Sequence, residues 1–199
     1  SSSSNRVNNI VLAASKINGK VLNPGESFSY NGTVGQRTAA AGFKEAGAYL
    51  EGKVVQEIGG GICQVSSTLY NAALLANLKI TSRTNHYFPV SYLPDGLDAT
   101  VSWQSPDFRF VNNTAYPVKI IASTNTSSMT LNIEIWGTND AGTHVVMTSD
   151  TSKIFDPNNP SVATGYTTTT YRNVYNSANQ LVSSNVEAKS TYHYHTADG

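Results

Sequence analysis

The chain has 199 residues, enough for one domain or for one domain with an appendage. Thirteen basic and thirteen acidic residues cancel, and no run of Lys or Arg is present, so the electrostatic footprint of a nucleic-acid-binding protein is missing. The longest apolar stretches fall far short of the roughly 20 residues that span a bilayer. Charged residues make up only 13%, a low fraction that is common in extracytoplasmic proteins.

The first half of the chain contains two predicted helices. Helical spacing of apolar residues predicts the first helix over residues 5–17. Alternation of apolar and polar residues then predicts a strand over 48–57, which ends before a run of three glycines, 59–61. The strongest helical pattern follows over 64–77, and its apolar surface is so broad that we expect this helix to be buried on most sides.

Strands dominate after the second helix. Beyond Gly137 the composition shifts to Thr, Ser, Asn and Tyr, and two β-branched segments, 164–175 and 180–195, flank an Asn-rich turn. They predict a long hairpin with too few bulky aliphatic residues for a fully independent core. Five shorter strands are predicted before it, over 79–83, 99–103, 108–111, 118–122 and 129–136.

The predicted fold class is α+β: a mainly antiparallel β-sheet with two principal helices and a C-terminal β-hairpin extension. Residues 1–4 are predicted to be a disordered linker, 5–137 the main domain and 138–199 a β-rich extension. The Ser-rich start is typical of a linker remnant, so a missing signal peptide says little about the full protein.

The single cysteine, Cys63, lies between the glycine run and the long helix. One cysteine cannot form an intramolecular disulfide, and in a secreted protein it suggests a reactive thiol. A helix N-terminus stabilises a thiolate through its dipole and unpaired N–H groups, which can also hold an oxyanion during acyl transfer. The sequence therefore predicts a nucleophile at Cys63, with an oxyanion loop made by Gly60, Gly61, Ile62 and Gln64.

Two other interpretations of this segment stay open. Cys63 can be a small buried hydrophobic residue, with the glycines only allowing close packing. The glycines and the helix start can also form a phosphate cradle, although the Gly-Lys-Ser/Thr sequence of a phosphate loop does not follow.

A thiol nucleophile needs a base and a group that orients the base. His86 comes just after the strand that follows the long helix, and a helix with a return strand can bring that loop back beside the helix N-terminus. We therefore predict His86 as the base and Asp98, at the start of the next predicted strand, as the orienting group. Each residue also has an ordinary structural interpretation. His86 can be a loop histidine that is hydrogen-bonded to the backbone, and Asp98 can be a turn residue.

Three further residues are predicted to support the site. Glu57, two residues before the glycines, can orient the loop or pair with Arg83. Ser66 lies in the first helical turn, where its hydroxyl more simply bonds unpaired N–H groups. His193 and His195 share one face of the last strand, but two histidines alone are a weak metal signal, so no metal ligands are predicted.

Several separated motifs, in this order, resemble the VanW-like family. The resemblance runs from about residue 5 to about residue 137, which it identifies as a VanW-like catalytic-type domain. The extension is similar to tails that often follow this domain. The motifs are residues 23–31 (NPGESFSYN) with Val34-Gly35, residues 59–71 (GGGICQVSSTLYN), residues 94–101 (PDGLDATV), and residues 107–110 (DFRF) with Asn112 or Asn113.

The resemblance implies a role in the bacterial cell envelope, because some VanW-domain proteins are understood to be L,D-transpeptidases with a cysteine nucleophile. That nucleophile corresponds to Cys63, the following histidine to His86, and Asp98 is carried over as the third residue. A Ser commonly follows the family's histidine, whereas Tyr87 stands here, which affects substrate fit or the orientation of His86. The His-Gly-Cys motif of the better-known L,D-transpeptidase family is absent, so that fold is not expected.

The sequence thus predicts a peptidoglycan L,D-transpeptidase that forms 3-3 cross-links through a Cys63 thioester, and an L,D-carboxypeptidase when water replaces the acceptor. Its partners are a donor tetrapeptide stem and an acceptor amine, with no nucleic acid and no cofactor; a monomer is expected. We expect an extracytoplasmic location, at the cell wall or anchored to the membrane through a missing N-terminal region. The alternative is a non-catalytic module that grips a stem-peptide carboxylate, in which Cys63 only packs.

Overall fold

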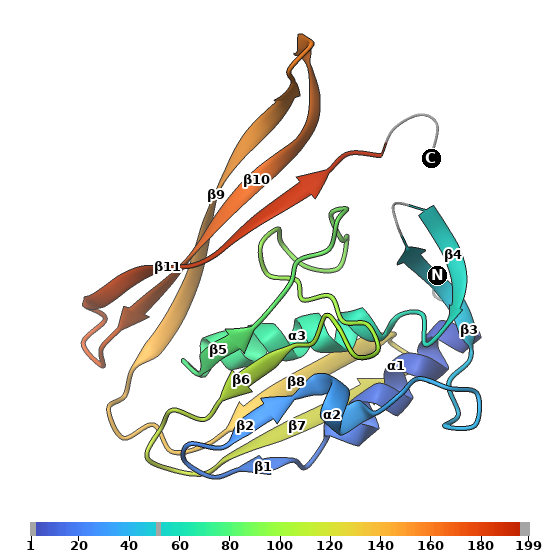
Figure 1. The fold of residues 1–199 in the computed structure, drawn as a ribbon. Helices are drawn as coiled ribbons and strands as arrows, with labels where there is room; N and C mark the ends of the chain where they lie inside the picture. The colour runs from blue at the N-terminus through green and yellow to red at the C-terminus, as the bar shows by residue number, and fades with distance from the viewer. Residues whose placement is uncertain (1–2, 51–52, 196–199) are drawn as a thin grey trace.

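The computed structural model describes residues 3–50 and 53–195 as an α+β structure of antiparallel sheets, which confirms the predicted fold class (Figure 1). Its helices are α1 (Ser4–Ile17), α2 (Tyr30–Val34) and α3 (Ile62–Leu75). The sheets have the strand orders β1-β7-β8, β2-β6-β5, β3-β4 and β11-β10-β9. The strands are β1 (Val21–Leu22), β2 (Ser27–Ser29), β3 (Glu45–Leu50), β4 (Lys53–Ile58), β5 (Lys79–Ser82), β6 (Arg109–Val111), β7 (Val118–Asn125), β8 (Thr130–Trp136), β9 (His144–Asp156), β10 (Asn159–Tyr175) and β11 (Leu181–His193).

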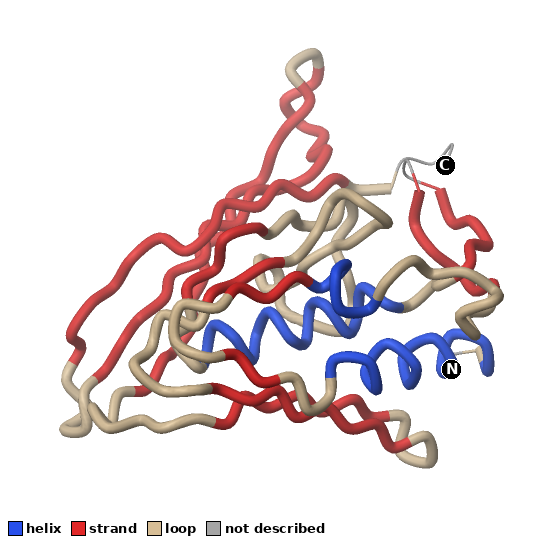
Figure 2. Tube along the Cα trace, turned by 60° about the horizontal axis from the view of Figure 1, so that its bottom comes forward, coloured by secondary structure: helices blue, strands red, loops and turns tan. Residues whose placement is uncertain are grey.

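The main core lies where α1 and α3 pack against β7 and β8, and Figure 2 shows the two helices running between these strands and the C-terminal sheet. Ile17, Leu69 and Ile120, from three of these elements, are fully buried. Burial of each such side chain stabilises the fold by roughly 1.5–3 kcal/mol. Buried residues occupy most faces of α3, as its broad apolar pattern predicts.

Helix α1 begins earlier than the sequence suggests. The Ser3 hydroxyl accepts a hydrogen bond from the Arg6 N–H at 3.2 Å and caps the helix, which starts at Ser4. The prediction of disorder over residues 1–4 is therefore wrong for Ser3 and Ser4, while residues 1 and 2 lie outside the described part of the chain. No helix within the described ranges combines the length and hydropathy of a membrane span.

Two strand predictions before residue 110 are wrong. The single strand over 48–57 is instead the antiparallel pair β3 and β4; positions 51 and 52 lie outside the described residues. Residues 99–103 form no strand, because their backbone bonds to side chains of α3 instead of to a neighbouring strand. The Ser67 hydroxyl accepts from the Ala99 N–H at 2.9 Å, and Ser66 donates to the Ala99 carbonyl at 2.6 Å.

The predicted C-terminal hairpin is confirmed as β10 and β11, and a third strand, β9, pairs with the other edge of β10. This three-stranded sheet reaches well beyond the main body at one end (Figure 1). Near the body, Gly96 lies so close to β10 that a Cβ there would be 2.2 Å from the Thr170 hydroxyl. The loop that carries Gly96 and Asp98 is therefore in contact with the C-terminal sheet.

Candidate active site

Cys63 occupies the first turn of α3, directly after the glycine loop. Gly61 is the N-cap residue and has a φ of 101°, in the region that residues with a side chain rarely adopt. A Cβ on Gly60 would lie 2.3 Å from the Ala46 carbonyl oxygen, so only glycine lets β3 approach this closely. These two glycines let the chain turn sharply from β4 into α3 and bring Cys63 to the helix start.

The backbone N–H groups around Cys63 differ in what they already bind. The Ile62 N–H donates to the Gly59 carbonyl at 3.3 Å, and the Gln64 N–H donates to the Gly61 carbonyl at 3.1 Å. Among the hydrogen bonds of the described residues, none is donated by the Cys63 N–H. The Gly61 N–H likewise donates none of them, so the Gly61 and Cys63 groups are the available donors here, whereas the Ile62 and Gln64 groups must first give up a turn hydrogen bond.

The Cys63 thiol faces the extended segment after Asp98. Its Sγ lies 3.5 Å from the Val101 nitrogen, 3.4 Å from the Val101 carbonyl oxygen and 3.7 Å from the Thr100 hydroxyl. Ser66 helps hold this segment by its bond to Ala99, so it does not cap unpaired helix N–H groups as predicted. Cys63 as a residue is partly buried and packs against the edge of the core.

The three predicted catalytic residues lie together. The Nδ1 atom of His86 is 2.6 Å from the Asp98 Oδ2 atom, which also accepts the His86 backbone N–H at 2.7 Å. The His86 ring is also close enough to the Cys63 side chain for each to shift the pKa of the other. Because Nδ1 faces Asp98, the other ring nitrogen is the one left for the thiol. The arrangement is thiol, imidazole and carboxylate in sequence, the geometry of an activated nucleophile.

The charges of Cys63, His86 and Asp98 support one another. Burial opposes the charged form of His86, but its bonds to Asp98 and Cys63 prevail and raise the pKa of His86 to about 9. Burial likewise opposes a thiolate, but the hydrogen bond and charge of His86, with smaller contributions from Val101 and Thr100, lower the pKa of Cys63. The pair therefore shifts the balance from the neutral thiol and imidazole toward the thiolate and the imidazolium.

Arg83 binds Asp98 and not Glu57. Its Nη2 lies 3.0 Å from the Asp98 Oδ1 atom, and its Nε donates to the Asp98 carbonyl at 2.6 Å. Both side chains of this ion pair are buried, whereas Glu57 lies exposed on β4. The predicted pairing of Glu57 with Arg83 is therefore wrong, since the buried carboxylate outcompetes the exposed one for the guanidinium.

Two residues of β11 that the sequence analysis missed complete the surroundings of Asp98. The buried Tyr192 hydroxyl donates a hydrogen bond to the Asp98 Oδ1 atom and accepts the Gly96 N–H at 2.8 Å. The buried Ser190 hydroxyl accepts from Arg83 Nη1 at 2.6 Å. Neither residue stands in a motif, so only the three-dimensional contact between β11 and the loop reveals them.

The histidines of the C-terminal segment form aromatic stacks. The His193 ring stacks on Tyr87 with centroids 4.1 Å apart, and the His195 ring stacks on Phe88 at 3.9 Å. The His193 N–H also donates to the Tyr87 carbonyl at 2.9 Å, so Tyr87, directly after His86, is held against the end of β11. In the described part of the chain, no group of three His, Cys, Asp or Glu side chains is arranged to hold a metal ion.

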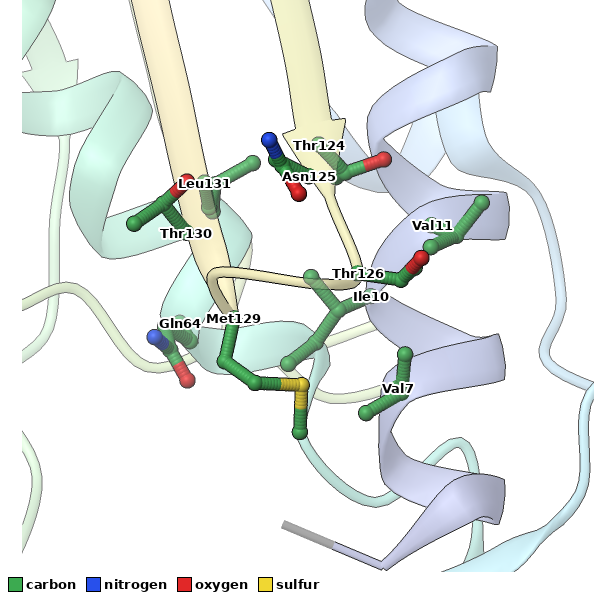
Figure 3. A pocket seen from close by; sticks show the side chains of 10 residues that line it. All are labelled: Val7, Ile10, Val11, Gln64, Thr124, Asn125, Thr126, Met129, Thr130 and Leu131. Atoms are coloured by element: carbon green, nitrogen blue, oxygen red, sulfur yellow. The ribbon is translucent and has the colours of Figure 1, made fainter. Parts of the chain in front are cut away.

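A pocket lies between α1 and the turn that joins β7 to β8 (Figure 3). Val7 and Ile10 of α1 face Met129 of the β7–β8 turn across it, and Gln64 lies at its edge. Neither Cys63 nor His86 lines this pocket. It borders the reactive segment through Gln64 alone, so the chemistry of the site lies outside it.

Comparisons with known proteins agree with the motifs. The sequence model of the family described as "VanW like protein" matches residues 5–136. The chain is 46% identical over 133 residues to "Uncharacterized protein YoaR" of Bacillus subtilis (strain 168), which covers 67% of this chain and 44% of that protein. It is 34% identical over 115 residues to "Vancomycin B-type resistance protein VanW" of Enterococcus faecalis (strain ATCC 700802 / V583), covering 55% and 42%. The chain thus spans less than half the length of these relatives, and no solved structure matches it.

Proposed function

The chain belongs to the VanW-like protein family, and from that premise we propose that it is a peptidoglycan L,D-transpeptidase that forms 3-3 cross-links. The observation that carries the proposal is the grouping of Cys63, at the start of α3, with His86 and with the Asp98 carboxylate that binds the His86 ring. A relative named as a vancomycin resistance protein supports a cell-wall role, since vancomycin acts on peptidoglycan stem peptides. This role places the protein outside the cytoplasm.

In the first half-reaction, the Cys63 thiolate attacks the carbonyl carbon at the L-centre of a diamino acid in a donor tetrapeptide. The new C–S bond gives a tetrahedral oxyanion, which the Cys63 N–H at the helix N-terminus is placed to stabilise. The C–N bond to the terminal D-Ala then breaks, and the His86 imidazolium gives its proton to the leaving amine. The product is a thioester on Cys63 and a neutral His86.

In the second half-reaction, the side-chain amine of another stem attacks the thioester. His86, now neutral, accepts a proton from this amine while the C–S bond breaks and a new amide bond forms. The thiolate and the imidazolium are restored together. If water attacks in place of the amine, the same steps release a free tripeptide, which is L,D-carboxypeptidase activity.

The test is incubation of the protein with tetrapeptide muropeptides, followed by mass spectrometry of the products. We expect the wild type to release D-Ala and to form 3-3 dimers, and Cys63→Ala to do neither. Tripeptide without dimers would identify a carboxypeptidase. Binding of the muropeptides without any product would instead support the non-catalytic binding module.

A further inference from the structure

Arg37 lies across the glycine loop from the core. A Cβ on Gly59 would be 2.9 Å from the Cβ of Arg37, so the arginine stem packs directly on the loop that leads to Cys63. Its Nη1 donates to the Asn31 side-chain oxygen at 2.9 Å and to the Gly35 carbonyl at 3.0 Å. The guanidinium is also 5.8 Å from the centre of the Trp103 ring. These contacts fix the position of the cation.

The Arg37 guanidinium forms no ion pair in the described structure, although the charges of Asp107 and Glu57 act on it from beyond contact distance. Its two acceptors are neutral, and none of the ion pairs formed by the described residues includes it. The side chain is partly buried, and this burial lowers the pKa of Arg37. A partly desolvated cation is unfavourable until an anion pairs with it, and the planar guanidinium matches a carboxylate in shape.

The same contacts place this cation beside the nucleophile. Asn31, which holds Arg37, also donates to the Ser102 carbonyl at 2.7 Å, and Ser102 follows the Val101 backbone that contacts Cys63 Sγ. The two groups, Arg37 and Cys63, are close enough for the charge of Cys63 to raise the pKa of Arg37. Trp103 is 44% exposed, so the Arg37 side of the site is open to a ligand.

We propose that Arg37, backed by Trp103, binds a carboxylate of the donor peptide while the neighbouring carbonyl lies at Cys63. This proposal rests on the proposed function and names the feature by which the donor is recognised. A tetrapeptide stem offers two such groups near the scissile bond: the carboxylate of the terminal D-Ala and that of the diamino acid itself. Either would pair with Arg37 only in a donor that retains the free acid.

The test measures peptide binding by calorimetry in a Cys63→Ala background, where no turnover occurs. Three peptides are compared: the free-acid tetrapeptide, the same peptide amidated at D-Ala, and the same peptide amidated at the diamino acid. Charge-assisted hydrogen bonds are the strong ones, so we expect one amide to bind about tenfold or more weakly than the free acid. The amide that loses affinity identifies the carboxylate.

Adding Arg37→Gln should abolish this preference, so that acid and amide bind alike. Arg37→Lys keeps the positive charge but lacks the planar guanidinium with its paired N–H donors, so it should retain part of the preference for the free acid. Lys44→Gln removes an exposed cation from the segment whose carbonyl bonds Gly59, and it should keep the full preference. Circular dichroism of each variant checks that the fold is intact.

Equal affinity for the three peptides, no binding of any of them, or a preference that survives Arg37→Gln would overturn this proposal. The proposed function fails separately. If the Cys63→Ala protein distinguishes acid from amide while the wild type forms no thioester and no product, the carboxylate site stands and the transpeptidase does not. If the wild type converts the free-acid and amidated peptides equally well, the transpeptidase stands and the carboxylate site does not.

Discussion

Tyr192 and Asp98 are 94 residues apart in the chain, yet the Tyr192 hydroxyl donates a hydrogen bond to the Asp98 carboxylate. The other oxygen of the same carboxylate is hydrogen-bonded to the His86 ring. Tyr192 belongs to β11, beyond residues 5–136 that the family sequence model matches. The C-terminal sheet therefore takes part in holding the proposed site, and its contribution can be tested residue by residue.

Tyr192→Phe should slow alkylation of Cys63 by iodoacetamide at pH 7 by several-fold. Without the phenol, the Asp98 carboxylate loses one of the hydrogen bonds that hold it in place, so the His86 ring that it orients is positioned less firmly beside Cys63. Loss of a hydrogen bond to a charged group should also lower the free energy of unfolding by about 1.5–3 kcal/mol. Tyr166→Phe is the control, because Tyr166 packs on the Tyr192 ring without bonding Asp98. Equal alkylation rates in the two variants would contradict a positioning role for Tyr192.

Alkylation of Cys63 should begin well below the pKa of roughly 8.5 of a free thiol. The pKa of Cys63 is lowered and that of His86 is raised to about 9, so the thiolate and the imidazolium are favoured together below about pH 9. His86→Asn removes the cation, and the alkylation profile should move to higher pH, with at least a tenfold lower rate at pH 7. Superimposable profiles of wild type and variant would show that His86 does not ionise Cys63.

Transpeptidation should decline as the pH rises through about 9. Above this pH the imidazolium loses the proton that the leaving D-Ala amine needs, although the thiolate remains. A pH–rate profile of D-Ala release, with the alkylation profile measured alongside, separates the two groups. Release that continues undiminished to pH 10.5 would assign the acid to a residue other than His86.

Arg83→Gln should be strongly destabilising, whereas Glu57→Gln should be close to neutral. Arg83 is the buried partner of Asp98, and its removal leaves a carboxylate without its cation, a change worth about 3–5 kcal/mol. Glu57 is exposed and does not contact Arg83. Urea unfolding measures both free energies. A similar loss in both variants would contradict the pairing described above.

Gly60→Ala should destabilise the protein by about 1–3 kcal/mol because its Cβ would overlap the Ala46 carbonyl of the facing strand. Gly47→Ala is the matched control: its nearest neighbour would be 3.9 Å away, an ordinary contact. The thermal unfolding midpoints of the two variants separate the effect of the close contact with the facing strand from the effect of replacing a glycine as such. An unchanged midpoint for Gly60→Ala would show that the loop has room to move.

The sequence predicts the central helix and the position of Cys63 at its start well because both depend on local signals. Apolar spacing marks α3, and the glycines before Cys63 mark the sharp turn at its start. The approach of His86 to this helix also follows from local geometry, since β5 returns directly from the end of α3. These features need no knowledge of distant parts of the chain.

The parts that the sequence does not predict are those decided by distant contacts. Residues 99–103 have a strand-like pattern, yet Ser66, Ser67 and Cys63 of α3 bind their backbone. Ser190 and Tyr192 look like ordinary residues of a polar strand until β11 meets the loop of Asp98. The sequence analysis pairs Arg83 with Glu57, because the sequence does not show which acidic residue is buried beside the guanidinium. In the fold that residue is Asp98.

The most direct test of the account is the mass of the intact protein after incubation with a donor tetrapeptide and no acceptor. The account predicts an adduct on Cys63 equal to the donor minus D-Ala, which hydroxylamine removes because it is a thioester, and no adduct on Cys63→Ala. Absence of the adduct and of released D-Ala, from a wild-type protein whose Cys63 is reduced and alkylates readily, would contradict acyl transfer at this site.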